Sequence, residues 1–332
     1  MTARTSSTII VILILSILMS FSLNMIMKPA ASAPENILHV DQAGNGDFLT
    51  IQSAINESAI YDTIYVHNGL YYENIFIDKP ITLKGEDTSE TVIDGSQHQS
   101  VITILSDNVS ISGLTIRHSG RVNDAGIKVD SSDHVSIMDC NIYSNNYGIY
   151  LYRSSDNTVS QCYIRNNFYG ILIQSVSRSN TVTYCQINDN SNTGISICCS
   201  SAQNVIHNCD FTSNNKFGID VSVGYNTIYL NNFIDNGMDN GLNARSKQEN
   251  QWDFERKGNY WSDYDEQKEG ARDTDGDDIV DSPYLIPEEN YDYYPFISQI
   301  DQGMGTGEGI PGFLFIGCLL GLLIVFLAKK YC

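Results

Sequence analysis

A short acidic loop near the C-terminal end holds the residues best suited to binding a metal ion. Five aspartates lie within a run of nine residues, and they are Asp273, Asp275, Asp277, Asp278 and Asp281. Carboxylates at alternating positions of a tight loop supply the hard oxygen ligands that Ca²⁺ prefers. The loop departs from the usual pattern because Asp278 replaces the glycine of the sharp turn and Tyr284 replaces the final glutamate. A solvated acidic loop is the alternative, but we expect Ca²⁺ binding because clustered carboxylates otherwise repel one another.

Three tyrosines are the best candidates for binding sugar rings. Tyr150 and Tyr152 alternate with apolar residues along one short strand, so we expect both to point outward, with Tyr163 outward on the next repeat. Flat aromatic faces beside Asn and Gln side chains suit a carbohydrate ligand. An equally open interpretation is that the aromatic residues here, including Tyr147 and Tyr169, only stack on one another.

Two polar columns recur once per repeat of about 23 residues. The cysteine column is Cys140, Cys162, Cys185 and Cys209, and the asparagine column is Asn145, Asn167, Asn190, Asn214 and Asn236. The cysteines share the parity of an isoleucine column, which predicts thiols buried in the core as small hydrophobic groups. Disulfides between neighbouring repeats are an open alternative in an exported chain. We do not expect copper, because a copper site needs converging Cys, Met or His side chains, and His207 and Cys209 are predicted to face different ways.

The elements that position these residues follow from the same repeat. Gly-Ile or Gly-Leu pairs recur at intervals of 22 to 24 residues, beginning at Gly126, Gly148, Gly170, Gly194, Gly218 and Gly241. Between them, apolar and polar residues alternate over short runs, which indicates strands with one buried face. Such strands are stable only when stacked about 4.8 Å apart, and the asparagines then form a ladder of amide hydrogen bonds. The sequence predicts an all-β fold, a right-handed parallel β-helix over residues 34–243, with a short helix covering its first rung.

Both ends of the chain carry segments typical of exported, membrane-anchored proteins. Residues 1–33 indicate a signal peptide or signal anchor, and residues 310–328 are an apolar run long enough for a transmembrane or sorting helix. The lysines that follow place the tail, residues 329–332, in the cytoplasm unless the segment is processed. Between coil and helix we expect an acidic, aromatic cap over residues 244–300 and a Gly-rich linker over residues 301–309. Two N-glycosylation sequons are present, at Asn56 and Asn108.

Charge and the outward columns argue against two classes of function. The net charge of −20 excludes a nucleic-acid ligand, because phosphate binding needs a face rich in Lys and Arg. A lyase or hydrolase needs carboxylates, or a carboxylate beside Arg or Lys, on adjacent rungs. The outward positions that follow the cysteine and the Gly-Ile pair do not stack two carboxylates. Only the first rungs stay open as a place for an active site, around Asp94, His98, Arg117 and His118.

Three stretches of the chain resemble known protein groups. The opening Asp47-Phe48-x-Thr50-Ile51-Gln52 resembles the start of pectate-lyase-like β-helices. The segment Gly258-Asn259-Tyr260-Trp261-Ser262-Asp263-Tyr264, with Asp281-Ser282-Pro283-Tyr284 downstream, resembles NosD-type proteins. That family is described as periplasmic copper-binding, with a domain type shared by carbohydrate-binding proteins and sugar hydrolases. Pro311-Gly312-Phe313 resembles archaeal PGF-type surface-sorting tails.

Together these features favour a membrane-anchored cell-surface protein that binds carbohydrate or surface matrix without catalysis. Its expected partners are a glycan and, through the C-terminal helix, membrane lipid. A polysaccharide lyase or glycoside hydrolase on the same scaffold is the alternative function. A periplasmic copper accessory protein of the NosD kind is a weaker third alternative, because the fold itself hosts many unrelated functions.

Overall fold

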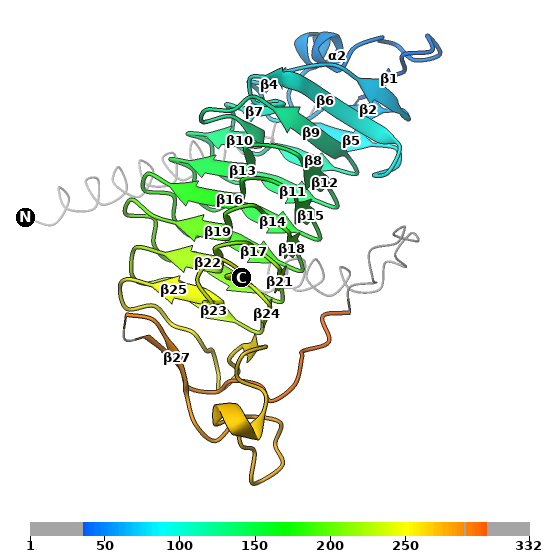
Figure 1. The fold of residues 1–332 in the computed structure, drawn as a ribbon. Helices are drawn as coiled ribbons and strands as arrows, with labels where there is room; N and C mark the ends of the chain where they lie inside the picture. Colours follow the sequence, from blue (N-terminus) through cyan, green and yellow to red (C-terminus); the bar gives the residue numbers. More distant parts are fainter. Residues whose placement is uncertain (1–35, 289, 304–332) are drawn as a thin grey trace, which may run out of the picture. The chain divides into compact units, whose positions relative to one another are not determined.

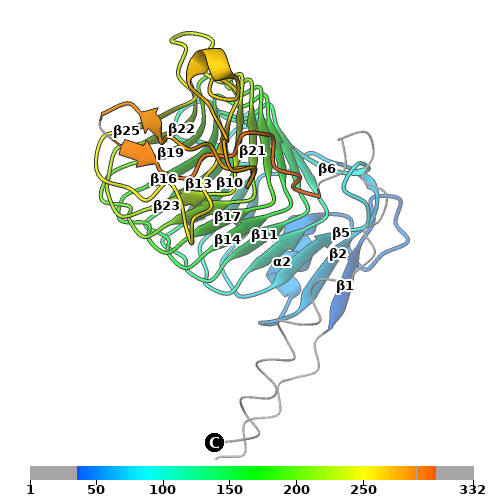
Figure 2. The same ribbon diagram turned by 90° about the horizontal axis from the view of Figure 1, so that it is seen from below.

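The computed structural model describes residues 36–288 and 290–303, which form a parallel β-helix with three sheets (Figure 1). Each turn of the coil contributes one strand to each sheet, so residues about one repeat apart pair in register. Figure 2, a view close to the coil axis, shows the rungs stacked behind one another. The predicted all-β solenoid is confirmed.

The three sheets are named A, B and C and hold nine, nine and eight strands in this part of the chain. Sheet A consists of β1 (Ile37–Val40), β2 (Thr63–Val66), β5 (Thr82–Gly85), β8 (Ser110–Ser112), β11 (Ser136–Met138), β14 (Thr158–Ser160), β17 (Thr181–Thr183), β20 (Val205–His207) and β23 (Thr227–Tyr229). Sheet B consists of β3 (Gly69–Tyr71), β6 (Thr91–His98), β9 (Thr115–Ser119), β12 (Asn141–Tyr143), β15 (Tyr163–Arg165), β18 (Gln186–Asn188), β21 (Asp210–Thr212), β24 (Asn232–Ile234) and β26 (Tyr260–Trp261). Sheet C consists of β4 (Ile75–Ile77), β7 (Ile102–Ile104), β10 (Ala125–Asp130), β13 (Tyr147–Tyr152), β16 (Tyr169–Gln174), β19 (Thr193–Ile197), β22 (Phe217–Val221) and β25 (Ala244–Ser246).

The core is built from the middle residue of each three-residue strand. In sheet B, the inward column runs through Ile142, Ile164 and Ile187, all fully buried, while the residues on either side face outward. Toward the C-terminal end the column becomes aromatic, and Phe233 stacks on Phe211 and on Trp261 with ring centroids 4.9 and 4.4 Å apart. Stacking equal side chains at each rung fills the coil without gaps, which favours an in-register repeat.

The N-terminal end of the coil is closed by one short helix, α2 (Ile51–Glu57). Ile51, Ala54 and Ile55 form its buried face, and the predicted short helix is present. The Thr50 side chain caps its first turn, and the Glu73 carboxylate accepts hydrogen bonds from the backbone N–H groups of Ile51 and Gln52. The open edge of the first rung is therefore covered rather than left for another chain to pair with.

The predicted asparagine ladder is present at the corner between sheets B and C. Each amide oxygen accepts from the backbone N–H and the side-chain amide of the asparagine one rung before it, as between Asn190 and Asn167 at 3.0 and 3.2 Å. A second ladder, at the corner between sheets C and A, was not predicted. It consists of Asn157, Asn180, Asn204, Asn226 and Asn250, five residues before the cysteine column where the two overlap.

The C-terminal end is closed by a cap that binds the last rungs through one buried carboxylate. Strand pairing continues past residue 243, because β25 pairs with β22 and β26 pairs with β24. Asp292, in the hairpin of β27 (Tyr284–Ile286) and β28 (Asn290–Asp292), accepts from the Asn259 N–H at 2.7 Å and from Trp261 Nε1 at 2.9 Å. The cap also holds the 3₁₀ helix η1 (Gln267–Glu269). The motif around Asn259 and Trp261 thus has a structural role, because it binds the cap hairpin to the last rungs.

Within the described residues, no helix is long and apolar enough to cross a membrane. The predicted signal segment, residues 1–33, and the predicted transmembrane helix, residues 310–328, lie outside those residues, as does the tail after them.

Candidate functional site

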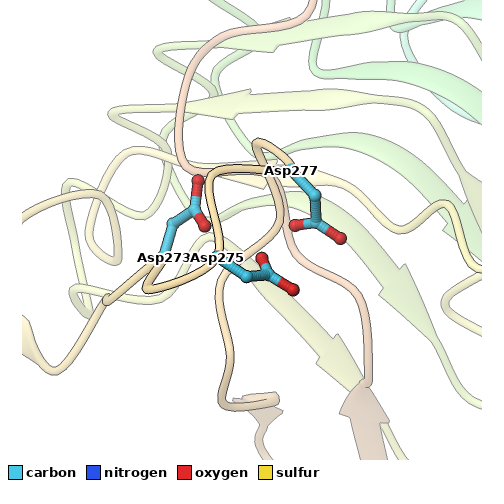
Figure 3. Close-up of side chains that lie close together, drawn as sticks. All are labelled: Asp273, Asp275 and Asp277. Atoms are coloured by element: carbon cyan, nitrogen blue, oxygen red, sulfur yellow. The ribbon is translucent and has the colours of Figure 1, made fainter.

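The acidic loop of the C-terminal cap brings three of its five aspartates together (Figure 3). One carboxylate oxygen each from Asp273, Asp275 and Asp277 lies within 4.8 Å of the other two. Asp273 is fixed by backbone N–H groups, from Gly276 at 2.7 Å and Asp278 at 3.1 Å, which lower its pKa. The negative charge of Asp277 has the largest effect on Asp275 and raises its pKa. Desolvation and the negative charge of Asp273 raise this pKa further. The three carboxylates are arranged so that they could share one cation, and a bound cation would relieve their mutual repulsion.

The other two predicted ligands have different roles. Asp281 closes the base of the loop, where its carboxylate accepts from the Thr274 N–H and hydroxyl at 3.1 and 2.7 Å. Asp278 has a backbone φ of +66°, so the position usually held by glycine does adopt the left-handed conformation. Neither carboxylate joins the group of three. Ca²⁺ binding therefore stays a prediction, with three converging side chains rather than five.

The cysteine column faces the core. Cys140, Cys162, Cys185 and Cys209 are at most 2% exposed, and each thiol donates to backbone carbonyl groups, as Cys185 does to Thr183. Burial raises the pKa of the Cys185 thiol well above its usual range. All six cysteines in residues 36–288 and 290–303 are free thiols. The column is a packing element of the coil, and it holds no inter-rung disulfide.

The three predicted sugar-binding tyrosines do not form one surface, because they lie on two different faces of the coil. Tyr150 points outward from sheet C, as expected, but it is only 6% exposed because Tyr147 and Tyr152 pack against it and its hydroxyl donates to Gln174. Tyr163 lies on β15 of sheet B, a different face of the coil. The alternative interpretation, aromatic residues stacked along the coil, describes sheet C better, since Tyr147 also contacts Tyr169.

The outer face of sheet B carries two continuous columns of polar side chains. One column follows the cysteine positions and begins one rung earlier: Thr115, Asn141, Tyr163, Gln186, Asp210 and Asn232. The other is Asp94, Arg117, Tyr143, Arg165, Asn188 and Thr212, of which the sequence singled out Asp94 and Arg117 but not the continuation of the column. From the third repeat on, this column lies three residues after each cysteine, but its first two members precede the cysteine column, so no alignment on cysteine could find them.

In the middle of this face, several buried polar atoms have no hydrogen-bond partner among the described residues. They are Asn141 Oδ1, Arg165 Nε and Asn188 Oδ1, which lie on three consecutive rungs, β12, β15 and β18. The Arg165 guanidinium lies over the rings of Tyr143 and Tyr163, 4.7 and 5.1 Å from their centroids. Buried donors and acceptors are almost always paired in a folded protein, so a cluster of unpaired ones marks a place where a ligand or water completes the pairing.

At the N-terminal end of the same face, Asp94 is the centre of a charged cluster. Its carboxylate accepts from Arg117 Nε and His118 Nδ1, both at 2.9 Å, and from the Ser96 N–H at 3.0 Å. Burial would raise the pKa of Asp94, but these hydrogen bonds outweigh it and lower the pKa. Because an ionised carboxylate only accepts, His118 donates through Nδ1, and in the neutral ring Nε2 is left as a free base. Arg117 also donates to the Tyr143 hydroxyl at 3.2 Å.

The C-terminal end of the face is covered. Asn232 exchanges hydrogen bonds of 2.8 Å with the backbone of Ile300, and Gln302 binds Asn208 and the Leu230 carbonyl. Burial raises the pKa of Asp210 beneath this segment. The open part of the face therefore runs from β6 to β18.

The family of periplasmic copper-binding proteins (NosD) matches residues 51–266, which is most of the coil and the start of the cap. The chain belongs to the NosD family. Like other β-helix proteins, it resembles solved structures at low identity: an alginate lyase from Paenibacillus sp. (TM-score 0.54, 17% identity, covering 64% of this chain and 85% of that one) and pectate lyase Pel9A (0.50, 15%, covering 69% and 74%). These likenesses show the fold, a right-handed parallel β-helix.

One plant protein matches in sequence over a short stretch. Pectinesterase/pectinesterase inhibitor 22 from Arabidopsis thaliana is 35% identical over 101 residues, or 28% of this chain and 18% of the plant protein. Because the match spans less than a fifth of that protein, it carries no assignment of activity.

Among the described residues of this NosD-family chain, the side chains that converge in a group of three or more as candidate metal ligands are carboxylates. The one group of three or more His, Cys, Asp or Glu side chains that converges within them is the aspartate loop, whose hard ligands suit Ca²⁺. His207 stacks on Tyr229 at the surface while Cys209 is buried, so these two face opposite ways, as predicted. Both sequons, at Asn56 and Asn108, lie on exposed positions, and their glycosylation stays a prediction.

Proposed function

We propose that this protein binds carbohydrate along the outer face of sheet B, between β9 and β18. The observation that carries the proposal is the pair of buried, unpaired amide oxygens, Asn141 Oδ1 and Asn188 Oδ1. A buried acceptor without a donor costs about 1–3 kcal/mol, and because both side chains are half-buried, a rotation of the amide can bring its oxygen to a ligand that supplies the donor. Sugar hydroxyl groups are such donors, and they come at regular spacing along a chain of sugar units.

The same face offers aromatic surface beside the unpaired amides. Tyr143 and Tyr163 project from neighbouring rungs, about 4.8 Å apart, and the Arg165 guanidinium lies over both rings. Rings held in this way present edges and part of their faces to a ligand at little cost in conformational entropy. The names of the two similar solved structures, an alginate lyase and a pectate lyase, agree with a polysaccharide ligand.

We also propose that the protein is displayed at the cell surface. The signal segment (residues 1–33) exports the chain, and the apolar segment (residues 310–328) anchors it in membrane lipid or is processed by a sorting enzyme. Ca²⁺ bound by Asp273, Asp275 and Asp277 stabilises the C-terminal cap that precedes the anchor.

The binding surface is tested by a glycan array with the double variant Asn141→Ala and Asn188→Ala. We expect a loss of binding of at least tenfold across all bound glycans, because two hydrogen bonds to the ligand disappear. The matched control is Asn215→Ala with Asn240→Ala, which removes two amides in turns away from sheet B. Unchanged binding by the first variant, or equal loss in both, contradicts the proposed surface.

Calcium is tested separately by calorimetric titration and thermal unfolding. Ca²⁺ should raise the midpoint of unfolding, by an amount equivalent to about 2.7 kcal/mol when its concentration is a hundred times Kd. Asp275→Asn with Asp277→Asn should abolish the shift, and Mg²⁺ should give less, because it demands a stricter geometry. Identical unfolding with Ca²⁺ and with chelator rejects the site.

A second candidate function, polysaccharide β-elimination, is favoured by one observation, the Asp94–His118 pair. His118 Nε2 can remove the proton at C5 of a uronate unit while the bond from C4 to the leaving oxygen breaks and a C4=C5 double bond forms. The Tyr143 hydroxyl, held by Arg117, can return a proton to the leaving oxygen. This scheme needs no second reactant.

Hydrolysis by paired carboxylates is disfavoured on this face. Along its two outer columns, the acids of described residues are Asp94 and Asp210, five rungs or about 24 Å apart, whereas glycosidases need about 5–9.5 Å. Elimination is tested by following the ultraviolet absorbance of the unsaturated product on polyuronates. Activity that disappears in His118→Gln but persists in His134→Gln would establish it, and no absorbance change in the native protein would reject it.

A further inference from the structure

We infer that Arg165 forms a subsite for the carboxylate of an acidic sugar, so that the proposed surface selects uronate-containing glycans. This inference rests on the carbohydrate binding proposed above. The observation behind it is the buried Nε atom of Arg165, which has no hydrogen-bond partner among the described residues.

Arg165 differs from the other arginines that project from strands of the coil. Arg117 is bound to Asp94, and Arg245 forms a bidentate pair with Asp220 at 3.0 and 2.7 Å. Arg165 has no ion pair with any described residue, although the chain has 39 acidic residues against 19 basic ones. Among the described residues, no carboxylate therefore neutralises the charge of its guanidinium.

The side chain is also held in a fixed position. The rings of Tyr143 and Tyr163 contact the guanidinium, which orients its plane through cation–π attraction. A guanidinium presents donors in a planar fork that matches the two oxygens of a carboxylate. Arg165 lies between the unpaired amide oxygens of Asn141 and Asn188, so one sugar unit can give hydroxyl protons to the amides while its carboxylate accepts from Arg165.

The net charge of the protein makes this residue decisive for selectivity. At −20, the protein repels a polyanionic glycan over the screening length, which is about 8 Å at physiological ionic strength. Preference for an acidic sugar over its neutral counterpart must therefore come from a local cation. Along the outer columns of sheet B that cation is Arg165, because Asp94 already neutralises Arg117.

The experiment uses the full chain and pairs of oligosaccharides that differ only at the carboxyl group. One member of each pair contains galacturonate, glucuronate or mannuronate, and the other is its carboxyl-reduced form. We expect the native protein to bind one acidic member roughly tenfold to a hundredfold more tightly than its reduced form. Arg165→Gln should abolish that preference, so that both members of the pair bind with equal affinity, and an unchanged midpoint of thermal unfolding shows that the variant is folded.

Two further variants sharpen the result. Arg165→Lys should recover only part of the preference, because a lysine keeps the charge but loses the planar fork. Arg178→Gln, on an exposed turn outside sheet B, makes the same change in net charge and should leave the preference intact. Equal binding of both members by the native protein, or a preference that survives in Arg165→Gln, overturns the inference but not carbohydrate binding. Binding of neither member overturns both.

Discussion

The outer faces of sheets B and C are made of the same kinds of side chain, but they differ in whether those side chains satisfy one another. On sheet C, Tyr150 is covered by its neighbours and donates to Gln174 at 2.9 Å. On sheet B, buried atoms of Asn141, Arg165 and Asn188 have no partner among the described residues. Aromatic content alone therefore does not mark a binding surface in this fold. Unmatched polar atoms on an outer face are the better guide, because a ligand or water can complete their hydrogen bonds there.

The contrast in hydrogen bonding between sheets B and C reflects function only if the same structural elements stabilise both sheets. The ladder at the corner between sheets B and C provides a test, since Asn190 supports both faces. Asn190→Ala leaves the backbone N–H of Asn167 without its acceptor and leaves the Asn167 side-chain amide with the Ile142 carbonyl alone, so we expect the free energy of unfolding to fall by roughly 3–5 kcal/mol. Urea denaturation measures this. The neighbouring change Asn215→Ala, at a half-buried position whose side chain donates only to Asp239, should cost less, and a loss below about 1 kcal/mol for Asn190→Ala would mean that the ladder does not hold the corner.

On sheet C we expect a cost in stability without a cost in binding. Tyr150→Ala removes a buried ring, which should lower the free energy of unfolding by roughly 2–4 kcal/mol. Tyr150→Phe, which removes only the hydroxyl that donates to Gln174, should cost about 1 kcal/mol. The glycan-array profile should match that of the native protein in both variants. Lost glycan binding in a folded Tyr150→Ala protein would restore the tyrosines of sheet C as the site.

The covered end of sheet B offers a contrast in pH dependence. Burial raises the pKa of Asp292 to about 7, although hydrogen bonds from Trp261 and Asn259 oppose the shift. The folded state then holds a proton that the unfolded chain has released, so stability from this group is complete below pH about 4 and is lost as the pH rises to about 7.

Comparison with Asp292→Asn isolates this effect. Relative to that variant, the native protein should lose up to about 1.4 kcal/mol of unfolding free energy per pH unit over that window. Above pH about 7 the two curves should run parallel, and this is measured by urea denaturation at a series of pH values. Parallel curves across the whole range would show that Asp292 keeps an ordinary pKa.

The sequence predicted the scaffold better than the site, for a physical reason. Inward columns such as Cys162 and Ile164 recur because every rung needs the same packing, so their spacing reveals the fold and the ladder of Asn167. Outward residues are not repeated. Arg117 and Arg165 share a column that becomes visible only when the register of β9 against β12 is known.

The sequence also could not predict how far outward-facing side chains are buried by their neighbours. Alternation correctly predicted that Tyr150 points outward, but not that Tyr147 and Tyr152 cover it. In the same way, five aspartates at suitable spacing did not tell which of them converge, because Asp281 instead accepts hydrogen bonds from Thr274. Contacts between neighbouring side chains on one surface depend on rotamers and register together, and neither is written in the residue pattern.

The variant with the smallest expected change in stability tests the contrast between sheets B and C most directly. Asn188→Ala removes a buried acceptor that has no donor, so the free energy of unfolding should stay the same or rise by up to about 1 kcal/mol. Carbohydrate binding should weaken in the same variant, because residues kept for a ligand are often residues that the fold would be more stable without. The two measurements together separate this case from Tyr150→Ala, where stability falls and binding persists. A clear loss of stability in Asn188→Ala would mean that its amide already has an internal or water partner, and the two faces would then differ in composition only.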